Sequence, residues 1–423
     1  MQSMVKCLIC GAVFSAEETV CPVCGAGPEQ FVPVAPENVS FRRDTQEIFL
    51  VLGGGTAAFS AAEAIRERNA TCSIVLVTDE DTPPYARPML TKSFGAAEET
   101  LYLREPAWFE RQRILLLTGR RVERLDPNAQ EVWLDGGARL HYDRCVYALG
   151  AECFIPPIPG ASMPGAVAIR RLRDIRAIRR RLDGGAQRAV VIGGGVLGLE
   201  AAWALRQQGC RVTVLEASER AMMRQLDEES SAMLMDIARQ AGVEILCRAQ
   251  SERILGTEHV EGVRLQSGEE LPADLVVLSC GVRANLAVAQ AAGAKTERAV
   301  VVDAHMRTTL PGVFACGDCA QYEGMNSTIW PVATEMGRIA GANAAGEALP
   351  YRPVSLAITF QGMGTSLYAD GDTGRIADRT YRVETRRDDA RKTLEKRFYW
   401  NDTLCGVILL GDISQAGDYA RQL

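Results

Sequence analysis

The sequence predicts an α/β fold, because strand, glycine-rich turn, helix and strand follow one another twice along the chain. The first glycine turn is Gly-Gly-Gly-Thr-Ala-Ala at 53–58, and the second is Gly-Gly-Gly-Val-Leu-Gly at 193–198. The apolar runs expected to form the flanking strands are 48–52, 73–77, 188–192 and 211–215. A strand that runs into such a turn and then a helix is the arrangement of a Rossmann-like nucleotide-binding unit. We therefore expect two such units.

Composition favours a multidomain protein that works with small molecules or proteins. The 423 residues are 47% hydrophobic and 24% charged, and at about 150 residues per domain this length predicts two to four domains. A net charge of -6 gives no basic surface for nucleic acid. The longest apolar stretch, 189–199, is too short to span a membrane, and the first residues do not resemble a signal peptide. Thirteen cysteines, most of them scattered, fit reduced thiols in a cytoplasmic protein.

Four cysteines near the N-terminus predict a metal site. They form two Cys-x2-Cys pairs, Cys7 with Cys10 and Cys21 with Cys24. Each pair places two sulfurs on one tight turn, and two facing turns form the tetrahedral cage that suits iron or zinc. Residues 1–35 are too few to fold by apolar burial alone, so a bound metal would supply much of their stability.

Proline-bearing and polar segments mark the other expected boundaries. Residues 36–45 are expected to be a short linker after the N-terminal domain. Prolines at 155–160 predict a stiff connection between the two nucleotide-binding units. The last segment, 351–423, alternates short apolar runs with charged turns and is expected to form a small α+β domain.

Acidic residues follow the second strand of each nucleotide-binding unit. Glu216 comes 23 positions after Gly193, where a carboxylate accepts hydrogen bonds from a ribose 2′-hydroxyl and repels a 2′-phosphate. We therefore expect NADH to be preferred to NADPH, although Arg220 nearby leaves NADPH possible. Asp79 and Glu80 stand at the matching place in the first unit and are expected to hold a second adenosine ribose.

Further motifs resemble the FAD-dependent pyridine nucleotide oxidoreductases. They are Pro-Tyr-Ala-Arg-Pro-Met-Leu-Thr-Lys at 84–92, Tyr-Ala-Leu-Gly at 147–150, and the run at 309–318 that ends in Ala-Cys-Gly-Asp. Within this superfamily the chain is most similar to the branch that contains NADH:rubredoxin reductases, ferredoxin reductases, the flavin part of nitrite reductases and apoptosis-inducing factor. The resemblance covers about residues 45–350. The N-terminal cysteine segment, with its Phe31, resembles the short rubredoxin-like domain at the end of rubrerythrins.

The resemblance implies that 46–155 with 284–350 binds FAD and that 156–283 binds NADH. It implies FAD contacts for Gly53, Gly55, Thr56, Ala57, Ala58, Asp79, Glu80, Arg87, Lys92, Val122, Gly150, Arg170, Gly317, Asp318, Ile329 and Trp330. Among these, Val122 would meet the adenine through its backbone, Asp318 the ribityl chain, and Ile329 with Trp330 the flavin pyrimidine. The implied NADH contacts are Gly193, Gly195, Val196, Leu197, Gly198, Glu216 and Gly281.

The resemblance also implies a catalytic pair, Lys92 and Glu200, beside flavin N5. Burying either charge alone would be costly, whereas together they orient one another while the carboxylate guides the nicotinamide. The alternative is that Glu200 only stabilises the N-terminal end of its helix.

The chain departs from the members of the superfamily that reduce disulfides. It has no cysteine pair at their redox positions, and no histidine follows His305 to act as the C-terminal acid/base. Cys316 and Cys319 flank Asp318, and we expect them to be packing residues rather than a redox disulfide.

Together these features predict an enzyme that passes electrons from NADH through FAD to a fused Fe(Cys)4 centre and on to an external redox protein or small acceptor. One alternative is an NADH oxidase or reductase acting directly at FAD, with a structural zinc ribbon. Another is a flavin-bound signalling or scaffold protein. The chain is expected to be a monomer or a homodimer.

Overall fold

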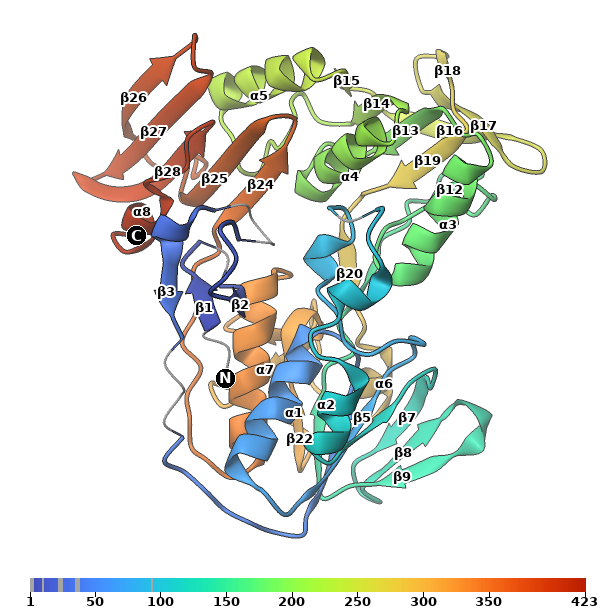
Figure 1. Ribbon diagram of the computed structural model, residues 1–423, viewed down its shortest axis with the longest axis vertical. Coiled ribbons are helices and arrows are strands. Elements are labelled where there is room, and N and C mark those ends of the chain that lie inside the picture. The colour runs from blue at the N-terminus through green and yellow to red at the C-terminus, as the bar shows by residue number, and fades with distance from the viewer. Residues whose placement is uncertain (1–3, 10, 22–25, 35–38, 93) are drawn as a thin grey trace.

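The computed structural model describes residues 4–9, 11–21, 26–34, 39–92 and 94–423. The chain forms two parallel-sheet units, an antiparallel C-terminal sheet and a small N-terminal sheet (Figure 1). The mixed α/β architecture predicted from the two glycine turns is therefore confirmed.

The first unit is built on a five-stranded parallel sheet. In spatial order its strands are β22 (Val313–Ala315), β10 (Arg144–Tyr147), β4 (Ile48–Leu52), β5 (Ser73–Val77) and β6 (Ile114–Leu117). The bounds of β4 and β5 are those expected from the sequence. Their side chains are largely buried, which is typical of a parallel sheet covered on both faces.

Helices α1 (Thr56–Arg68) and α7 (Trp330–Ala344) pack unusually closely beside this sheet. A Cβ atom added at Gly337 would lie 2.2 Å from the Ala57 carbonyl oxygen, and one at Gly341 would lie 2.2 Å from that of Ala61. Only glycine permits this backbone approach. The start of α7 is thereby fixed relative to the helix that follows the first glycine turn.

The second unit has its own five-stranded parallel sheet. Its strands, in spatial order, are β12 (Ala166–Val167), β19 (Leu275–Leu278), β13 (Arg188–Ile192), β14 (Arg211–Glu216) and β15 (Val243–Cys247). Its helices are α3 (Leu172–Asp183), α4 (Val196–Gln207) and α5 (Glu228–Gln240). The predicted strands 188–192 and 211–215 are thus confirmed, the latter with one additional residue.

Smaller elements surround the two sheets. Two antiparallel three-stranded sheets are β7 (Val122–Asp126), β8 (Glu131–Leu134) and β9 (Arg139–His141), and β16 (Ser251–Gly256), β17 (Val260–Leu265) and β18 (Glu270–Pro272). Two-stranded pairs are β11 (Ala151–Cys153) with β20 (Val282–Ala284), and β21 (Val300–Val302) with β23 (Ala320–Tyr322). Two short helices are α2 (Pro106–Arg111) and α6 (Ala287–Ala291).

The C-terminal segment forms a five-stranded antiparallel sheet followed by a short helix. Its strands, in spatial order, are β24 (Ile358–Gly362), β25 (Thr365–Gly371), β28 (Thr403–Leu410), β27 (Thr393–Trp400) and β26 (Arg382–Asp388), and its helix is α8 (Ala416–Ala420). In the described part of the chain, no helix combines the length and apolar character needed to cross a bilayer.

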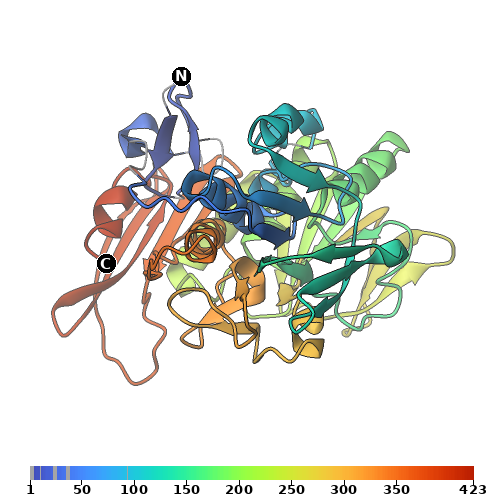
Figure 2. The ribbon, with the colours of Figure 1, turned by 90° about the horizontal axis from the view of Figure 1, so that it is seen from below.

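The described residues of 4–34, here called the N-terminal module, contain the antiparallel sheet β2–β1–β3. These strands are β1 (Met4–Cys7), β2 (Val13–Ser15) and β3 (Phe31–Pro33). The rings of Phe14 and Phe31 meet edge to face, with centroids 4.9 Å apart. Figures 1 and 2 show the module lying against the C-terminal sheet.

Candidate functional site

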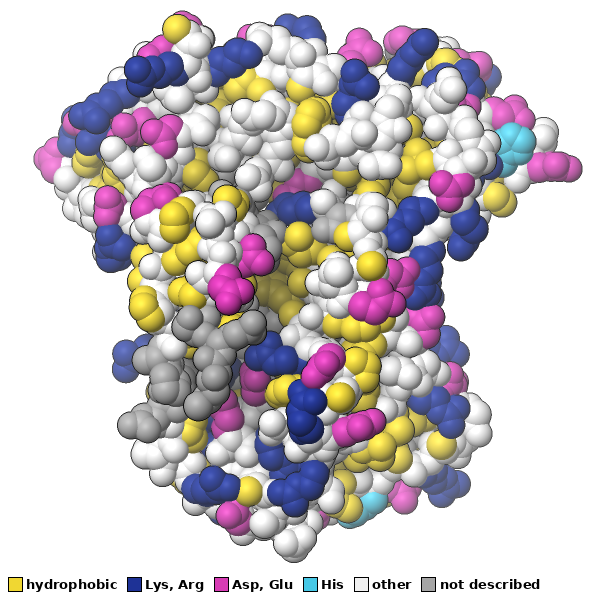
Figure 3. Space-filling view, viewed as in Figure 1, with side chains coloured by type: hydrophobic (Ala, Val, Ile, Leu, Met, Phe, Trp, Pro, Cys, Tyr) yellow, Lys and Arg dark blue, Asp and Glu magenta, His cyan; other side chains and the backbone are white. Residues whose placement is uncertain are grey.

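A cavity of about 410 Å³ lies between the two parallel-sheet units. Residues 54–57 of the first glycine turn line it, and so do Val196, Leu197 and Glu200 of α4. The face seen in Figure 3 is hollowed near its centre, with hydrophobic side chains visible at depth. The predicted site residues that line the cavity are Gly55, Thr56, Ala57, Asp79, Arg87, Lys92, Gly150, Arg170, Val196, Leu197, Glu200, Gly281, Asp318, Ile329 and Trp330.

The first glycine turn has the geometry needed to receive a phosphate group. Gly53 has φ +129°, and a Cβ atom there would lie 2.1 Å from the carbonyl oxygen of Ala148. Gly55, the N-cap of α1, has no side chain that could cap the helix. The helix N-terminus, with its positive dipole end, is thus left for an anionic ligand such as the pyrophosphate of a dinucleotide.

The second glycine turn has the same backbone geometry as the first. Gly193 has φ +116°, and a Cβ atom there would lie 2.2 Å from the Ser279 carbonyl oxygen. A Cβ atom at Gly198 would lie 2.0 Å from the carbonyl oxygen of Gly193 itself. Helix α4 also begins without a side-chain cap. The residues of both turns therefore fit a dinucleotide.

Glu216 lies at the end of β14, beside the second turn. Its Oε2 accepts a hydrogen bond from the Gly194 amide at 2.7 Å, and its Oε1 accepts one from the Ser218 amide at 2.7 Å. These bonds fix the carboxylate next to the glycine loop, which is the position from which a Rossmann unit selects its ribose.

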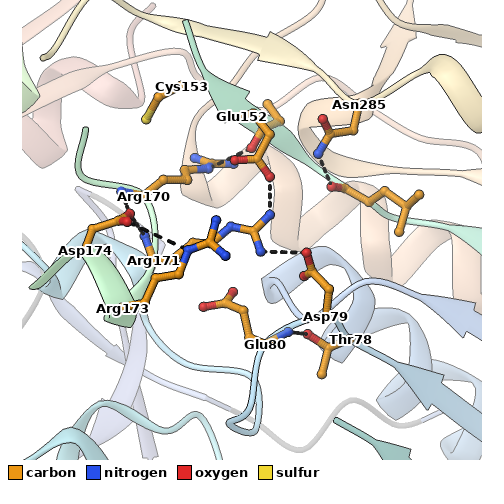
Figure 4. Close-up of polar contacts among 12 residues, drawn as sticks. Thr78, Asp79, Glu80, Glu152, Cys153, Arg170, Arg171, Arg173, Asp174 and Asn285 are labelled. Atoms are coloured by element: carbon orange, nitrogen blue, oxygen red, sulfur yellow. Dashed lines mark hydrogen bonds and ion pairs between the residues drawn. The ribbon is translucent and has the colours of Figure 1, made fainter. Parts of the chain in front are cut away.

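The two carboxylates predicted for the first ribose have different surroundings. Glu80 is 8% exposed, and its carboxylate accepts hydrogen bonds from the Tyr85 hydroxyl at 2.6 Å and from Arg87 at 2.5 Å. It therefore positions Arg87 and is not among the residues that line the cavity. Asp79 does line it, and its carboxylate accepts a hydrogen bond from Arg171 at 2.6 Å (Figure 4).

Arg171 is a residue of the site that the sequence did not indicate. Its guanidinium bridges Asp79 and Glu152, and all three residues line the cavity (Figure 4). The neighbouring Arg170 donates to Asp318 at 2.7 Å and to the Ala151 carbonyl at 2.9 Å. These arginines precede α3, whose arginine-rich pattern is typical of a solvated helix face.

Lys92 and Glu200 lie together at the junction of the two units. The Lys92 Nζ is 3.2 Å from Glu200 Oε1, and the Thr91 hydroxyl donates to Glu200 Oε2 at 2.8 Å. The Glu200 side chain is 5% exposed. Burial raises the pKa of Glu200, while the Lys92 charge and these hydrogen bonds act in the opposite direction. An ion pair held in this way can orient a ligand that reaches it from either unit.

The other residues predicted to contact FAD or NADH do not line the cavity. They are Gly53, Ala58, Glu80, Val122, Gly193, Gly195, Gly198, Glu216 and Gly317. Most belong to the glycine turns or to the strand ends behind them, where they shape the backbone. Val122 begins β7, and its side chain is buried in the core of the first unit.

Cys316 and Cys319 are buried thiols in the core of the first unit. The Cys319 Sγ contacts the carbonyl oxygen of Cys316 at 3.2 Å, and burial raises the pKa of Cys319 to about 12. A thiol with so high a pKa is a poor nucleophile at neutral pH. This environment supports the packing role expected from the sequence.

Cys7 and Cys21 are buried in one apolar cluster with Ile9 and Phe14. Cys10 and Cys24, the other two predicted ligands, lie outside the described residues. Within the described ranges, no group of three or more His, Cys, Asp or Glu residues is arranged to hold a metal ion. The four-cysteine metal site therefore stays a prediction.

Two nucleotide-binding units that share one cavity define a protein that brings two dinucleotides together. The chain belongs to the pyridine nucleotide-disulphide oxidoreductase family, whose sequence pattern matches residues 49–340.

Two relatives align with most of this chain. It is 29% identical over 367 residues to the assimilatory nitrate reductase electron transfer subunit of Bacillus subtilis strain 168, covering 86% of this chain and 47% of that protein. It is 34% identical over 309 residues to the ferredoxin–NAD(+) reductase component of the anthranilate 1,2-dioxygenase system of Burkholderia cepacia. This alignment covers 70% of this chain and 75% of that protein. The chain thus spans about half the length of the first relative.

A solved structure with a similar fold is the ferredoxin reductase for the CYP199A2 system from Rhodopseudomonas palustris. It matches with a TM-score of 0.80 and 30% sequence identity, over 88% of this chain and 92% of that one. The similarity therefore extends through both nucleotide-binding units and beyond them.

Proposed function

We propose that this chain is an NADH-dependent FAD oxidoreductase that delivers electrons to an external redox protein. The observation that carries the proposal is a cavity lined by residues of both glycine turns, with the Lys92–Glu200 pair at their junction. The names of the relatives, an electron transfer subunit and a ferredoxin–NAD(+) reductase component, support the same class of reaction.

In this proposal the first unit holds FAD. The N-terminus of α1 would receive the pyrophosphate, and Arg87, Arg170 and Asp318 would contact the rest of the group from the cavity wall. Bound FAD accepts a hydride as two electrons and can release them one at a time. The second unit would hold NADH, with Glu216 at its ribose and the Lys92–Glu200 pair orienting the nicotinamide.

We also propose that Cys7, Cys10, Cys21 and Cys24 hold iron and serve as the electron outlet. The chain lacks the cysteine pair and the C-terminal histidine that disulfide reduction requires, so electrons must leave the flavin by another route. A fused one-electron centre would also have a high effective concentration near the cavity, about millimolar for a short linker. A structural zinc in the same cysteines is the alternative.

The aerobically purified protein is expected to contain iron and FAD in equal amounts. Anaerobic addition of NADH should bleach the flavin absorption and then the ferric-thiolate absorption of the same polypeptide. A visible spectrum recorded with metal analysis tests both groups together. Stoichiometric zinc without iron would refute the proposed outlet and leave an oxidoreductase that acts directly at FAD.

The Glu216→Arg variant is expected to shift the kcat/KM ratio toward NADPH by about tenfold or more, because the carboxylate that repels a 2′-phosphate is replaced by a cation. Steady-state kinetics with both nucleotides measures the ratio. Glu219→Arg introduces the same charge at a nearby exposed acid and serves as the control. An unchanged ratio in Glu216→Arg would remove this residue from ribose selection.

A further inference from the structure

The N-terminal module is packed against the C-terminal sheet across a largely apolar interface. Ile9 and Phe14 share one buried cluster with Val407, Leu409 and Tyr419. The contact also includes a hydrogen bond: the buried Gln30 side chain donates to the Ser414 carbonyl oxygen at 2.6 Å. The views in Figures 1 and 2 agree on this placement. Side-chain contacts with the C-terminal segment therefore hold the module in place, in addition to its linker.

The same module reaches the wall of the cavity. Ile9 is one of the residues that line it, and its side chain is 7% exposed. Gly11 has φ +71°, and a Cβ atom there would lie 3.3 Å from the Cβ of Pro331. Pro331 follows Trp330 in the first turn of α7, and both residues line the cavity. The module thus touches the side of the cavity at which α7 begins.

We propose that the N-terminal module is a fixed wall of the flavin cavity, with Ile9 as the residue that seals it on the Trp330 side. A module that swung away would expose Ile9, Phe14 and the apolar face of the C-terminal sheet to water, which opposes movement. While the module stays in place, it keeps solvent and small solutes from entering on that side. The inference rests on the proposed function only in assigning FAD to this cavity.

The Ile9→Ala variant tests the seal, because it shortens a side chain that lines the cavity while the other module contacts remain. In the FAD-loaded full chain, the quenching of flavin fluorescence by iodide is expected to increase about twofold or more. Val13→Ala is the matched control, since Val13 belongs to the same module but is 51% exposed and does not line the cavity. Equal quenching in native, Ile9→Ala and Val13→Ala proteins would overturn the inference.

Hydrogen exchange provides a second measurement that needs no substitution. In the native full chain, the amides of Ile9 and Gly11 are expected to exchange more slowly with FAD bound than after its removal. If the exchange rates of these amides are the same with and without FAD, the module is not a wall of the FAD site. A purified chain that binds no FAD would instead overturn the proposed function itself, so the two failures are distinguishable.

Discussion

The Glu200→Gln variant is expected to reduce FAD with NADH about 100-fold more slowly than the native chain, because a buried charge that orients the nicotinamide is lost. Lys92 would also be left without the carboxylate that lies 3.2 Å from its Nζ. Anaerobic stopped-flow measurement of flavin absorption isolates this step from later electron transfer. A rate within twofold of native would leave Glu200 with only a structural role.

A double-mutant cycle supplies the control for this prediction. In the Lys92→Met/Glu200→Gln protein, the decrease in the rate of FAD reduction is expected to be smaller than the product of the decreases in the two single variants. The reason is that the double variant contains no unpaired charge at the site. Additive effects would show that the two residues act independently.

The same step is expected to depend on pH in a defined direction. Burial raises the pKa of Glu200, so its carboxylate becomes protonated at a higher pH than that of an exposed glutamate. Because the charged form is the orienting form, the rate of FAD reduction should fall as the pH drops through this raised pKa. That decrease should disappear in Glu200→Gln.

If Cys21 is a metal ligand as proposed, the Cys21→Ser variant is expected to contain no metal at this site. It should then pass electrons to an external redox protein at least about 100-fold more slowly, with FAD reduction by NADH unchanged. Cys21 is buried within the module, and a serine hydroxyl does not replace a thiolate ligand. Structural zinc contributes about 10–16 kcal/mol to the folding of zinc-finger peptides, so a module that loses a bound metal should also unfold more readily.

Metal analysis, hydrogen exchange of residues 4–34 and turnover with a redox protein measure these effects separately. Cys405→Ser is the matched control, because Cys405 is a partly buried thiol of the C-terminal sheet, remote in sequence from the predicted ligands. Native turnover in Cys21→Ser would favour direct reaction at FAD and a structural metal.

The fold was predictable where its signals are local. Each glycine turn lies between an apolar run and a helix, so β4, β5 and β13 have the expected bounds. The close approaches at Gly53 and Gly193 explain why these signals were reliable, since a larger residue at either position would meet backbone atoms. Lys92 and Glu200 were paired by resemblance, and the structure brings them into contact.

The parts of the site that were missed depend on contacts between distant segments. Arg171 reaches Asp79, 92 positions earlier in the chain, and its helix has the arginine-rich pattern of an exposed surface. Ile9 is an ordinary apolar residue in a cysteine-rich segment, and only the packing of the module on the C-terminal sheet brings it to the cavity. The Glu80 carboxylate, expected at a ribose, accepts hydrogen bonds from Tyr85 and Arg87, contacts that the sequence did not indicate.

The close contact of α1 with α7 has a consequence for how such proteins diversify. The helix that would receive the pyrophosphate and the helix that starts at Trp330 are locked together through Gly337 and Gly341, independently of the N-terminal module. The spacing between these two helices therefore does not depend on the N-terminal module. A different N-terminal module could be joined to this chain, by evolution or design, while that spacing is preserved.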